Sequence, residues 1–144
     1  MVINKFRGDY YYLSNFYPAK IEYKGLVYGS AEAAFQAQKC PERASDFCYL
    51  GPKSAKALGS RVELRKDWED VKIRIMFSIL LCKFTQNPDL REKLLNTGDA
   101  ILIEGNTWGD TYWGACRGTG KNILGRLLMT ARKAIREDVF DKYL

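Results

Sequence analysis

The longest periodic stretch of the chain, residues 68–86, most constrains what it can fold into. Apolar residues recur here at spacings of three and four, and further large side chains widen the stripe: Val71, Ile75, Met76, Ile79, Leu80, Cys82 and Phe84. This period is that of an α-helix with a broad apolar face. The pattern predicts one long helix in the core, around which the shorter elements are arranged.

The flanking segments predict a mainly helical α+β protein. Alternating residues around Lys24-Gly25 indicate a β-hairpin. Residues 100–104 look like a strand, and helix signals bound three further stretches: 52–59, 88–97 and 123–137. The 144 residues show no repeat or linker and suffice for one domain, residues 1–144. We therefore expect a single α+β domain, mainly helical, with a small early hairpin or sheet.

The absence of histidine excludes several kinds of chemistry. Ser-His-Asp and Cys-His nucleophile systems and His-ligated metal sites all need an imidazole. The cysteines form no C-x-x-C pair, so zinc and thioredoxin chemistry are poorly supported: Cys40, Cys48, Cys82 and Cys116. We expect neither a metal nor a cofactor. Acid–base work at neutral pH must then fall to Asp, Glu, Lys, Cys or Tyr with shifted pKa values.

Charge and hydropathy restrict the partners and the location. The net charge of +6 favours phosphorylated small molecules, nucleotides or nucleic acid, although a mildly basic protein without such a partner is the simpler interpretation. No apolar run approaches the roughly 20 residues that cross a bilayer. Residues 1–7 lack the apolar segment of a signal peptide. We expect a cytoplasmic protein without a membrane partner, and the oligomeric state stays open.

The helix predicted to begin after Ser30 carries reactive side chains. Ser30 is a good N-cap, because its hydroxyl can accept from a free N–H one turn into the helix. Helical spacing puts an acid, an aromatic ring, an amide and an amine on one face: Glu32, Phe35, Gln36 and Lys39. Glu32 lies one place too early for a capping box. The alternative is an acid favoured only by the helix dipole and a solvated lysine.

A glycine-rich loop, residues 105–120, precedes the last helix. It is not a P-loop, since position 115 is Ala and position 122 is Asn, where a Gly and a Ser or Thr are required. A turn of this kind at a helix N-terminus can still hold an anion through its backbone N–H groups. Equally, it can be a plain turn with Asn122 as the helix cap. Long loops of this kind are often functional.

Two tryptophans lie beside charged residues. Trp113 follows Asp110 in the glycine-rich loop, and Trp68 lies one helical turn before Lys72. Such pairs suit a site that stacks a flat base, although a lone tryptophan is more often part of the core. Asn15 lies in a segment dense in tyrosine and could bind the polar edge of such a ring.

Blocks along nearly the whole chain resemble, in order, those of the NADAR family, which includes the YbiA-type N-glycosidases: 12–16, 30–39, 65–72, 83–86, 94–98, 112–114 and 120–125. Two departures are visible. Many members have Glu-His-Tyr-Phe-Gln where this chain has Glu-Ala-Ala-Phe-Gln, so the acid is kept and the imidazole is absent. Many also have an acidic residue soon after the Trp-Gly pair, which this chain lacks.

The resemblance implies hydrolysis of the N-glycosidic bond between a phosphorylated ribose and a nitrogenous base. The implied substrates are a riboflavin-pathway pyrimidine riboside or ADP-ribosylated guanine, including guanine in nucleic acid. Glu32 would stabilise positive charge on the sugar or activate water. Lys39 would bind phosphate or form a Schiff base with the opened ribose. We expect a metal-independent hydrolase with its cleft between the Glu32 helix and the Trp113 loop.

The remaining residues implied by the resemblance would bind the substrate: Arg7, Asn15, Phe35, Gln36, Trp68, Lys72, Asp110, Trp113, Gly114, Lys121 and Asn122. The two tryptophans would stack on the base, Asp110 and Asn15 would orient sugar or base, and Arg7 with Lys121 and Asn122 would meet phosphates. One alternative is a module that binds NAD or ADP-ribose without cleaving it. Another is a basic nucleic-acid-binding protein, whose affinity would fall steeply with salt.

Overall fold

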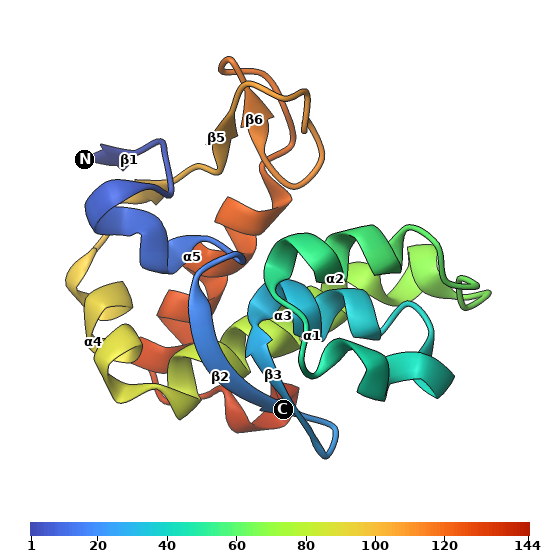
Figure 1. Cartoon of the computed structure of the whole chain (residues 1–144). Helices are drawn as coiled ribbons and strands as arrows, with labels where there is room; N and C mark the ends of the chain where they lie inside the picture. Colours follow the sequence, from blue (N-terminus) through green and yellow to red (C-terminus); the bar gives the residue numbers. More distant parts are fainter.

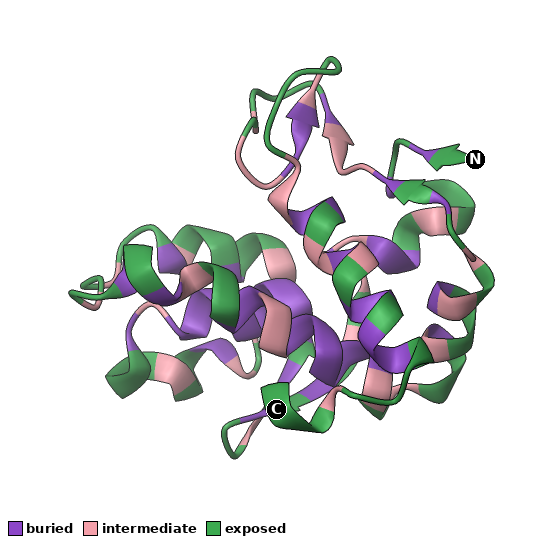
Figure 2. Ribbon diagram, turned by 180° about the vertical axis from the view of Figure 1, so that it is seen from behind, coloured by how far each residue is buried: buried purple, intermediate pink, exposed green.

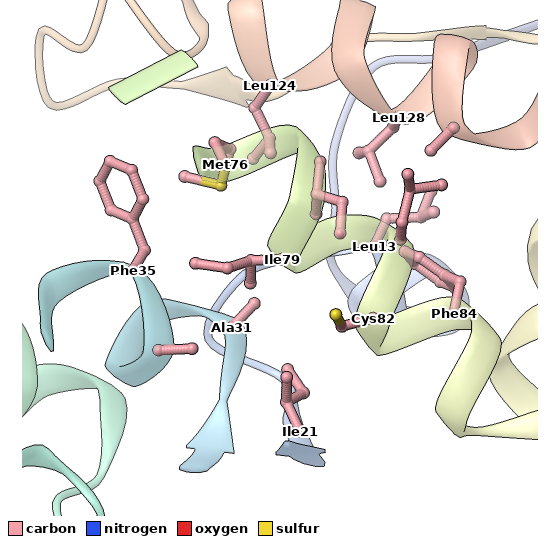
Figure 3. Packing of buried hydrophobic residues seen from close by; sticks show 14 of the residues in the cluster. Leu13, Ile21, Ala31, Phe35, Met76, Ile79, Cys82, Phe84, Leu124 and Leu128 are labelled. Atoms are coloured by element: carbon pink, nitrogen blue, oxygen red, sulfur yellow. The ribbon is translucent and has the colours of Figure 1, made fainter. Parts of the chain in front are cut away.

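Helix α3 lies at the centre of the fold, as its periodicity predicts. The computed structural model describes all 144 residues and places α3 between α5 on one side and α1 with a hairpin on the other (Figures 1 and 3). Met76 and Leu124 meet between α3 and α5, whereas Ile79 points toward α1 (Figure 3). The bounds of the three helices are Ala31–Ala37 for α1, Trp68–Gln86 for α3 and Ile123–Arg136 for α5. One cluster of 32 buried hydrophobic residues joins them.

The hairpin forms around the predicted turn. Strands β2 (Pro18–Tyr23) and β3 (Leu26–Ser30) pair antiparallel, with Tyr23 opposite Leu26 at the turn. Lys24 has φ of 49° and Gly25 has φ of 84°, as in the type I′ turns whose twist matches that of paired strands. The hairpin delivers the chain directly into α1, and the Ser30 hydroxyl accepts from the Ala33 N–H at 3.1 Å. The predicted N-cap is therefore confirmed.

The other elements surround this centre. Figure 2 shows buried residues gathered along the central helices, whereas buried and exposed residues alternate in the outer segments. Strand β1 pairs in parallel with β4, and β5 pairs in parallel with β6. With the hairpin, these pairs make three sheets of two strands each. None of the helices is long and apolar enough to cross a lipid bilayer. The bounds of the smaller elements are β1 Val2–Ile3, η1 Gly8–Leu13, η2 Pro41–Phe47, α2 Pro52–Gly59, α4 Pro88–Asn96, β4 Ile101–Leu102, β5 Gly105–Asn106, β6 Ala115–Cys116 and η3 Asp141–Tyr143, where η denotes a 3₁₀ helix.

The fold is α+β and mainly helical, as predicted, but two local expectations need correction. The segment 105–120 is not loop throughout, because β5 and β6 pair within it. Helical spacing in residues 123–137 predicts an apolar stripe made of Ile123, Leu127, Leu128, Ala131 and Ile135. Ile123 and Leu127 are only half-buried, whereas Leu124 is buried. Leu124 points toward α3 (Figure 3), so tertiary packing rotates the first turn of α5 away from the face suggested by spacing.

Lys83, a basic residue in the last turn of α3, is fully buried. Its Nζ donates to the Ser14 carbonyl at 2.9 Å and lies 5.0 Å from the centre of the Phe84 ring. Burial lowers the pKa of the Lys83 ammonium from 10.5 to about 7, and the negative charge of Glu104 opposes this shift. This hydrogen bond connects the segment after η1 to the core helix, although removing the Lys83 amine from water costs free energy.

The stability of the wild-type protein is expected to rise with pH relative to Lys83→Met between about pH 7 and 10.5. Across this window the lysine is neutral in the folded chain but protonated in the unfolded chain. The unfolded state therefore binds more protons, and folding becomes more favourable as pH rises. Urea unfolding of both proteins at pH 7 and pH 10 should show a change of roughly 3–5 kcal/mol in their difference. A difference that does not vary with pH would contradict this assignment.

Candidate active site

One cavity of about 690 Å³ brings most of the predicted site residues together. Its walls come from the N-terminal segment, from α1, α2, α3 and the start of α5, and from the segment 104–113. Ligand pockets commonly have volumes of about 300–1,000 Å³. The residues that line it are Phe6, Arg7, Tyr11, Ser14, Asn15, Phe16, Glu32, Phe35, Gln36, Lys39, Lys56, Trp68, Lys72, Met76, Glu104, Trp108, Asp110, Trp113 and Leu124.

Glu32 faces this cavity from a helix that is buried along its whole length. The side chain is only 9 % exposed, and its Oε2 accepts a 2.7 Å hydrogen bond from the Gln36 Nε2 one turn later. Its backbone N–H donates to the Asn15 carbonyl at 2.9 Å, which fixes the start of α1 against the segment after η1. Burial raises the pKa of the Glu32 carboxyl, and the Gln36 hydrogen bond partly offsets this.

Lys39 follows the end of α1 and lines the same cavity. The amine is half-buried, and its backbone carbonyl accepts from the Arg65 N–H at 2.8 Å. Burial lowers the pKa of the Lys39 ammonium, and the carboxylate of Glu32 works against this shift. The acid and the amine of the predicted face therefore share one pocket.

Two further lysines lie near Lys39. Lys56 comes from α2 and Lys72 from α3, and both line the cavity. The positive charges of Lys56 and Lys72 add to the lowering of the Lys39 pKa. Lys72 also pairs with Glu69 at 2.5 Å and lies 4.3 Å from the centre of the Tyr112 ring. Sequence reasoning missed Lys56, because nothing in the pattern of α2 separates it from Lys53, and both residues are exposed.

Aromatic rings form one side of the cavity. Phe35 lies between the two predicted tryptophans, with ring centres 5.1 Å from Trp68 and 5.3 Å from Trp113. Trp68 is largely buried and so serves both the core and the pocket wall. Trp108, which sequence reasoning passed over, is 55 % exposed and lies 5.6 Å from the Arg7 guanidinium. The pocket therefore carries a wall of aromatic rings next to charged groups.

Glu104 is the most important residue that sequence reasoning missed. It lies between β4 and β5, is half-buried, and its Oε2 is buried without a hydrogen-bond partner. Burial raises the pKa of this carboxyl to about 7, with smaller contributions in the same direction from Asp110 and Glu32. The sequence offered one signal for this residue, an acid at the end of the predicted apolar strand 100–104. That signal alone does not distinguish a site residue from an ordinary surface charge.

Asp110 lines the pocket but is committed to the local backbone. Its Oδ1 accepts from the N–H groups of Tyr112 and Trp113 at 3.1 and 3.0 Å. The residue thus shapes the turn that presents Trp113 to the cavity. Asn15, another predicted site residue, differs from Asp110 in this respect. Its side-chain Oδ1 is buried and has no hydrogen-bond partner.

Three predicted binding residues do not line the cavity: Gly114, Lys121 and Asn122. Lys121 is exposed and lies 5.6 Å from the centre of the Tyr112 ring. The Asn122 side chain is bonded to backbone, accepting from the Glu104 N–H at 2.9 Å and donating to the Leu102 carbonyl at 2.9 Å. Neither residue lines the pocket, and their contact with a phosphate stays a prediction.

Both interpretations of the turn before α5, a backbone anion site and a plain turn capped by Asn122, need correction. The N–H groups of residues 121–124, at the start of the helix, already donate to carbonyl oxygens of residues 111–114 at 2.8–3.1 Å. Asn122 has φ of 51° and makes no cap hydrogen bond, so it is not a conventional N-cap either. Long-range backbone pairing has taken the donors that a local view left free.

Comparison with known proteins identifies relatives over almost the whole chain. The family model described as the NADAR domain matches residues 3–136. N-glycosidase YbiA of Escherichia coli is 39% identical over 133 residues, which cover 88% of this chain and 82% of that protein. N-glycosidase Npun_R5314 of Nostoc punctiforme is 38% identical, with coverage of 85% and 84%.

Two further matches extend the comparison. Riboflavin biosynthesis protein VVA0006 of Vibrio vulnificus is 36% identical over 132 residues, which are 88% of this chain and 36% of that longer protein. The NMR structure of the E. coli protein YbiA superposes with a TM-score of 0.83 at 34% identity, covering 98% of this chain and 87% of the other. The fold and the sequence agree, and the chain belongs to the NADAR domain family.

Proposed function

We propose that the protein is an N-glycosidase that hydrolyses the bond between a phosphorylated ribose and a nitrogenous base. The observation that carries this proposal is the carboxyl of Glu32, almost buried in the wall of a pocket that also holds aromatic rings and lysines. The names of the relatives, N-glycosidase and riboflavin biosynthesis protein, support the same chemistry.

Glu32 suits the charge that develops when such a bond breaks. As the base departs, positive charge grows on the anomeric carbon and the ring oxygen of the ribose. An ionised carboxylate in a site that excludes water stabilises this charge far more than one in bulk solvent. The Gln36 amide holds the carboxylate in place through its 2.7 Å hydrogen bond. The same carboxylate can take a proton from an attacking water.

The two ends of a nucleotide find complementary groups in the pocket. Lys56 and Lys72 supply positive charge for a phosphate or diphosphate. Phe35 and Trp113, whose rings meet edge to face, offer aromatic surface against which a base can stack. The buried, unpartnered Oδ1 of Asn15 can accept from an N–H of the base or a hydroxyl of the sugar. These placements make a phosphorylated riboside the best-supported substrate class.

Substrate trials test the proposal directly. A phosphoribosyl aminopyrimidine of the riboflavin pathway and DNA carrying ADP-ribosylated guanine are incubated with the protein, and release of the free base is measured. We expect release from at least one of them. Tight binding without release would favour a non-catalytic ADP-ribose-binding module instead. Binding to any DNA that weakens steeply with salt, again without release, would favour a nucleic-acid-binding protein.

Lys39 is proposed as the nucleophile of a covalent route. Its neutral amine, favoured by the lowered pKa, attacks the anomeric carbon, the bond to the base breaks, and ring opening leaves an imine that water hydrolyses. Borohydride added during turnover should reduce this imine and leave a sugar adduct on Lys39, visible by mass spectrometry. Lys39→Met should give no adduct, while exposed Lys53→Met should behave as wild type. An active Lys39→Met enzyme without any adduct in wild type would remove the covalent route.

A further inference from the structure

Glu104 enters the pocket from a different part of the fold than Glu32. It precedes β5, which lies well apart from α1 in Figure 1, yet both carboxyl groups line the same cavity. The proposed function above gives Glu32 a role and leaves Glu104 without one. A second carboxyl in the pocket that holds Glu32 calls for an explanation of its own.

The backbone of Glu104 is held by three hydrogen bonds. Its N–H donates to the Asn122 Oδ1 at 2.9 Å, and its carbonyl accepts from the Ala115 N–H at 2.9 Å and the Asn106 Nδ2 at 3.4 Å. A Cβ at Gly114 would overlap that carbonyl oxygen and stand 3.0 Å from the Glu104 Cγ. Gly114 and Asn122, predicted to bind substrate, therefore position Glu104.

The carboxyl of Glu104 is left without a partner. No hydrogen bond within the protein reaches its buried Oε2, although the backbone beneath it is fully bonded. A buried polar atom without a partner costs about 1–3 kcal/mol, so such atoms are rare in stable folds. A carboxyl on a firmly bonded backbone, with an empty bonding position inside a cavity, is arranged to bond a ligand.

Cleavage of an N-glycosidic bond creates a need for a proton donor. A nitrogen that leaves with both bonding electrons is a very poor leaving group unless it is protonated as it departs. The chain has no histidine, and Asp110 already accepts two backbone N–H groups. Glu32 is assigned to the positive charge of the sugar. Glu104 is the remaining carboxyl of the pocket.

We infer that Glu104 is a second catalytic acid, which donates its proton to the nitrogen of the departing base. This inference rests on the proposed N-glycosidase function. The bond between the anomeric carbon and the nitrogen breaks, its electron pair stays on the nitrogen, and that nitrogen takes the proton from Glu104. Water or Lys39 forms the new bond to the anomeric carbon. Where water attacks directly, its proton passes to Glu32, and exchange with solvent restores both carboxyl groups.

The charged groups around Glu104 set the pH range in which this step operates. Asp110 from the loop and Glu32 from α1 favour the protonated acid, whereas Arg7 from the N-terminal segment and Lys83 from α3 oppose it. Burial dominates, and the pKa of Glu104 is raised to about 7. The proton donor is therefore present below about pH 7, and kcat/KM should fall as pH rises above that value.

The test compares Glu104→Gln with wild type on two substrates that differ in their need for a proton. The amine of a phosphoribosyl aminopyrimidine must be protonated to leave, whereas 4-nitrophenyl riboside 5-phosphate releases a stable anion. With the first, we expect kcat to fall about 100- to 10,000-fold with KM nearly unchanged. With the second, the loss should stay below about fivefold. Exposed Glu92→Gln on α4 is the matched control and should equal wild type with both.

The pH profile gives an independent readout. Wild type should lose kcat/KM for the aminopyrimidine above about pH 7, and this alkaline decline should disappear in Glu104→Gln. Equal losses on both substrates, or a decline that persists in the variant, would overturn the role of Glu104. If wild type cleaves only the aminopyrimidine, the pH profile decides alone. Failure of wild type to release any base would instead overturn the proposed function. Thermal unfolding of the variant verifies that it is folded.

Discussion

Glu32→Gln is expected to lower kcat at least 100- to 1,000-fold while the Kd for the substrate changes by less than about threefold. The substitution preserves the size of the side chain and its ability to accept from Gln36, but it removes the negative charge. The charge matters in the transition state, when the sugar becomes positive, and much less in the bound ground state. Single-turnover base release and equilibrium binding, measured on the same substrate, separate the two effects.

The control for this experiment is Glu63→Gln, which removes an exposed carboxylate from the segment between α2 and α3. It should leave both constants unchanged. Burial raises the pKa of the Glu32 carboxyl, so its ionised form costs stability at neutral pH. Glu32→Gln should therefore unfold at the same temperature as wild type or a higher one at pH 8. Turnover near the wild-type rate would refute the role of Glu32, and a loss caused by unfolding is excluded by the same melting data.

Gly59→Ala is expected to lower kcat/KM about 100-fold, although Gly59 ends α2 and does not line the cavity. A Cβ at this position would overlap the Oε1 of Gln36. The Gln36 amide would have to turn away, and Glu32 would lose the 2.7 Å hydrogen bond that holds its carboxylate. Alanine is favoured over glycine in a helix by about 1 kcal/mol, and this gain offsets the cost of displacing the Gln36 amide. The free energy of unfolding should therefore change little. Steady-state kinetics and thermal unfolding of the variant measure both quantities.

A double-mutant cycle shows whether Gly59 acts through Gln36. Gln36→Ala removes the side chain that the new methyl group would strike, so adding Gly59→Ala to it should cost less than about twofold more. Additive losses would mean that Gly59 acts by another route. Gly29→Ala is the matched control, because a Cβ there has no neighbour within 4 Å and Gly29 lies on β3, which leads into α1.

Local sequence patterns were sufficient for the elements that the chain forms within short range. The spacing of Val71, Ile75 and Ile79 predicted α3, because a buried helix needs an apolar residue on nearly every turn. The Lys24-Gly25 turn and the Ser30 cap were also predictable, since each depends on interactions between residues at most five apart. The face of α1 that carries Glu32 and Lys39 followed from the same periodicity, and both residues line the cavity.

Contacts across the fold were not predictable in this way. Lys56 reaches the cavity only because α2 packs beside α1, and nothing in its own segment signals that neighbour. The donors before α5 looked available for an anion, but they pair with carbonyl oxygens about ten residues earlier in the chain. Asn122 resembled a helix cap or a phosphate contact, whereas its amide bonds the backbone on either side of Ile103.

The sequence by itself determined the helices, the hairpin and the acid-bearing face of α1, because periodicity, capping and turn geometry act between near neighbours. Its resemblance to one family also indicated the chemistry to look for. Only the tertiary structure decided that Glu104 lies in the same cavity as Glu32 and that its carboxyl is left without a bond. Burial and the approach of distant charges set the reactivity of such a group. Both depend on segments about seventy residues apart that meet only in the folded chain.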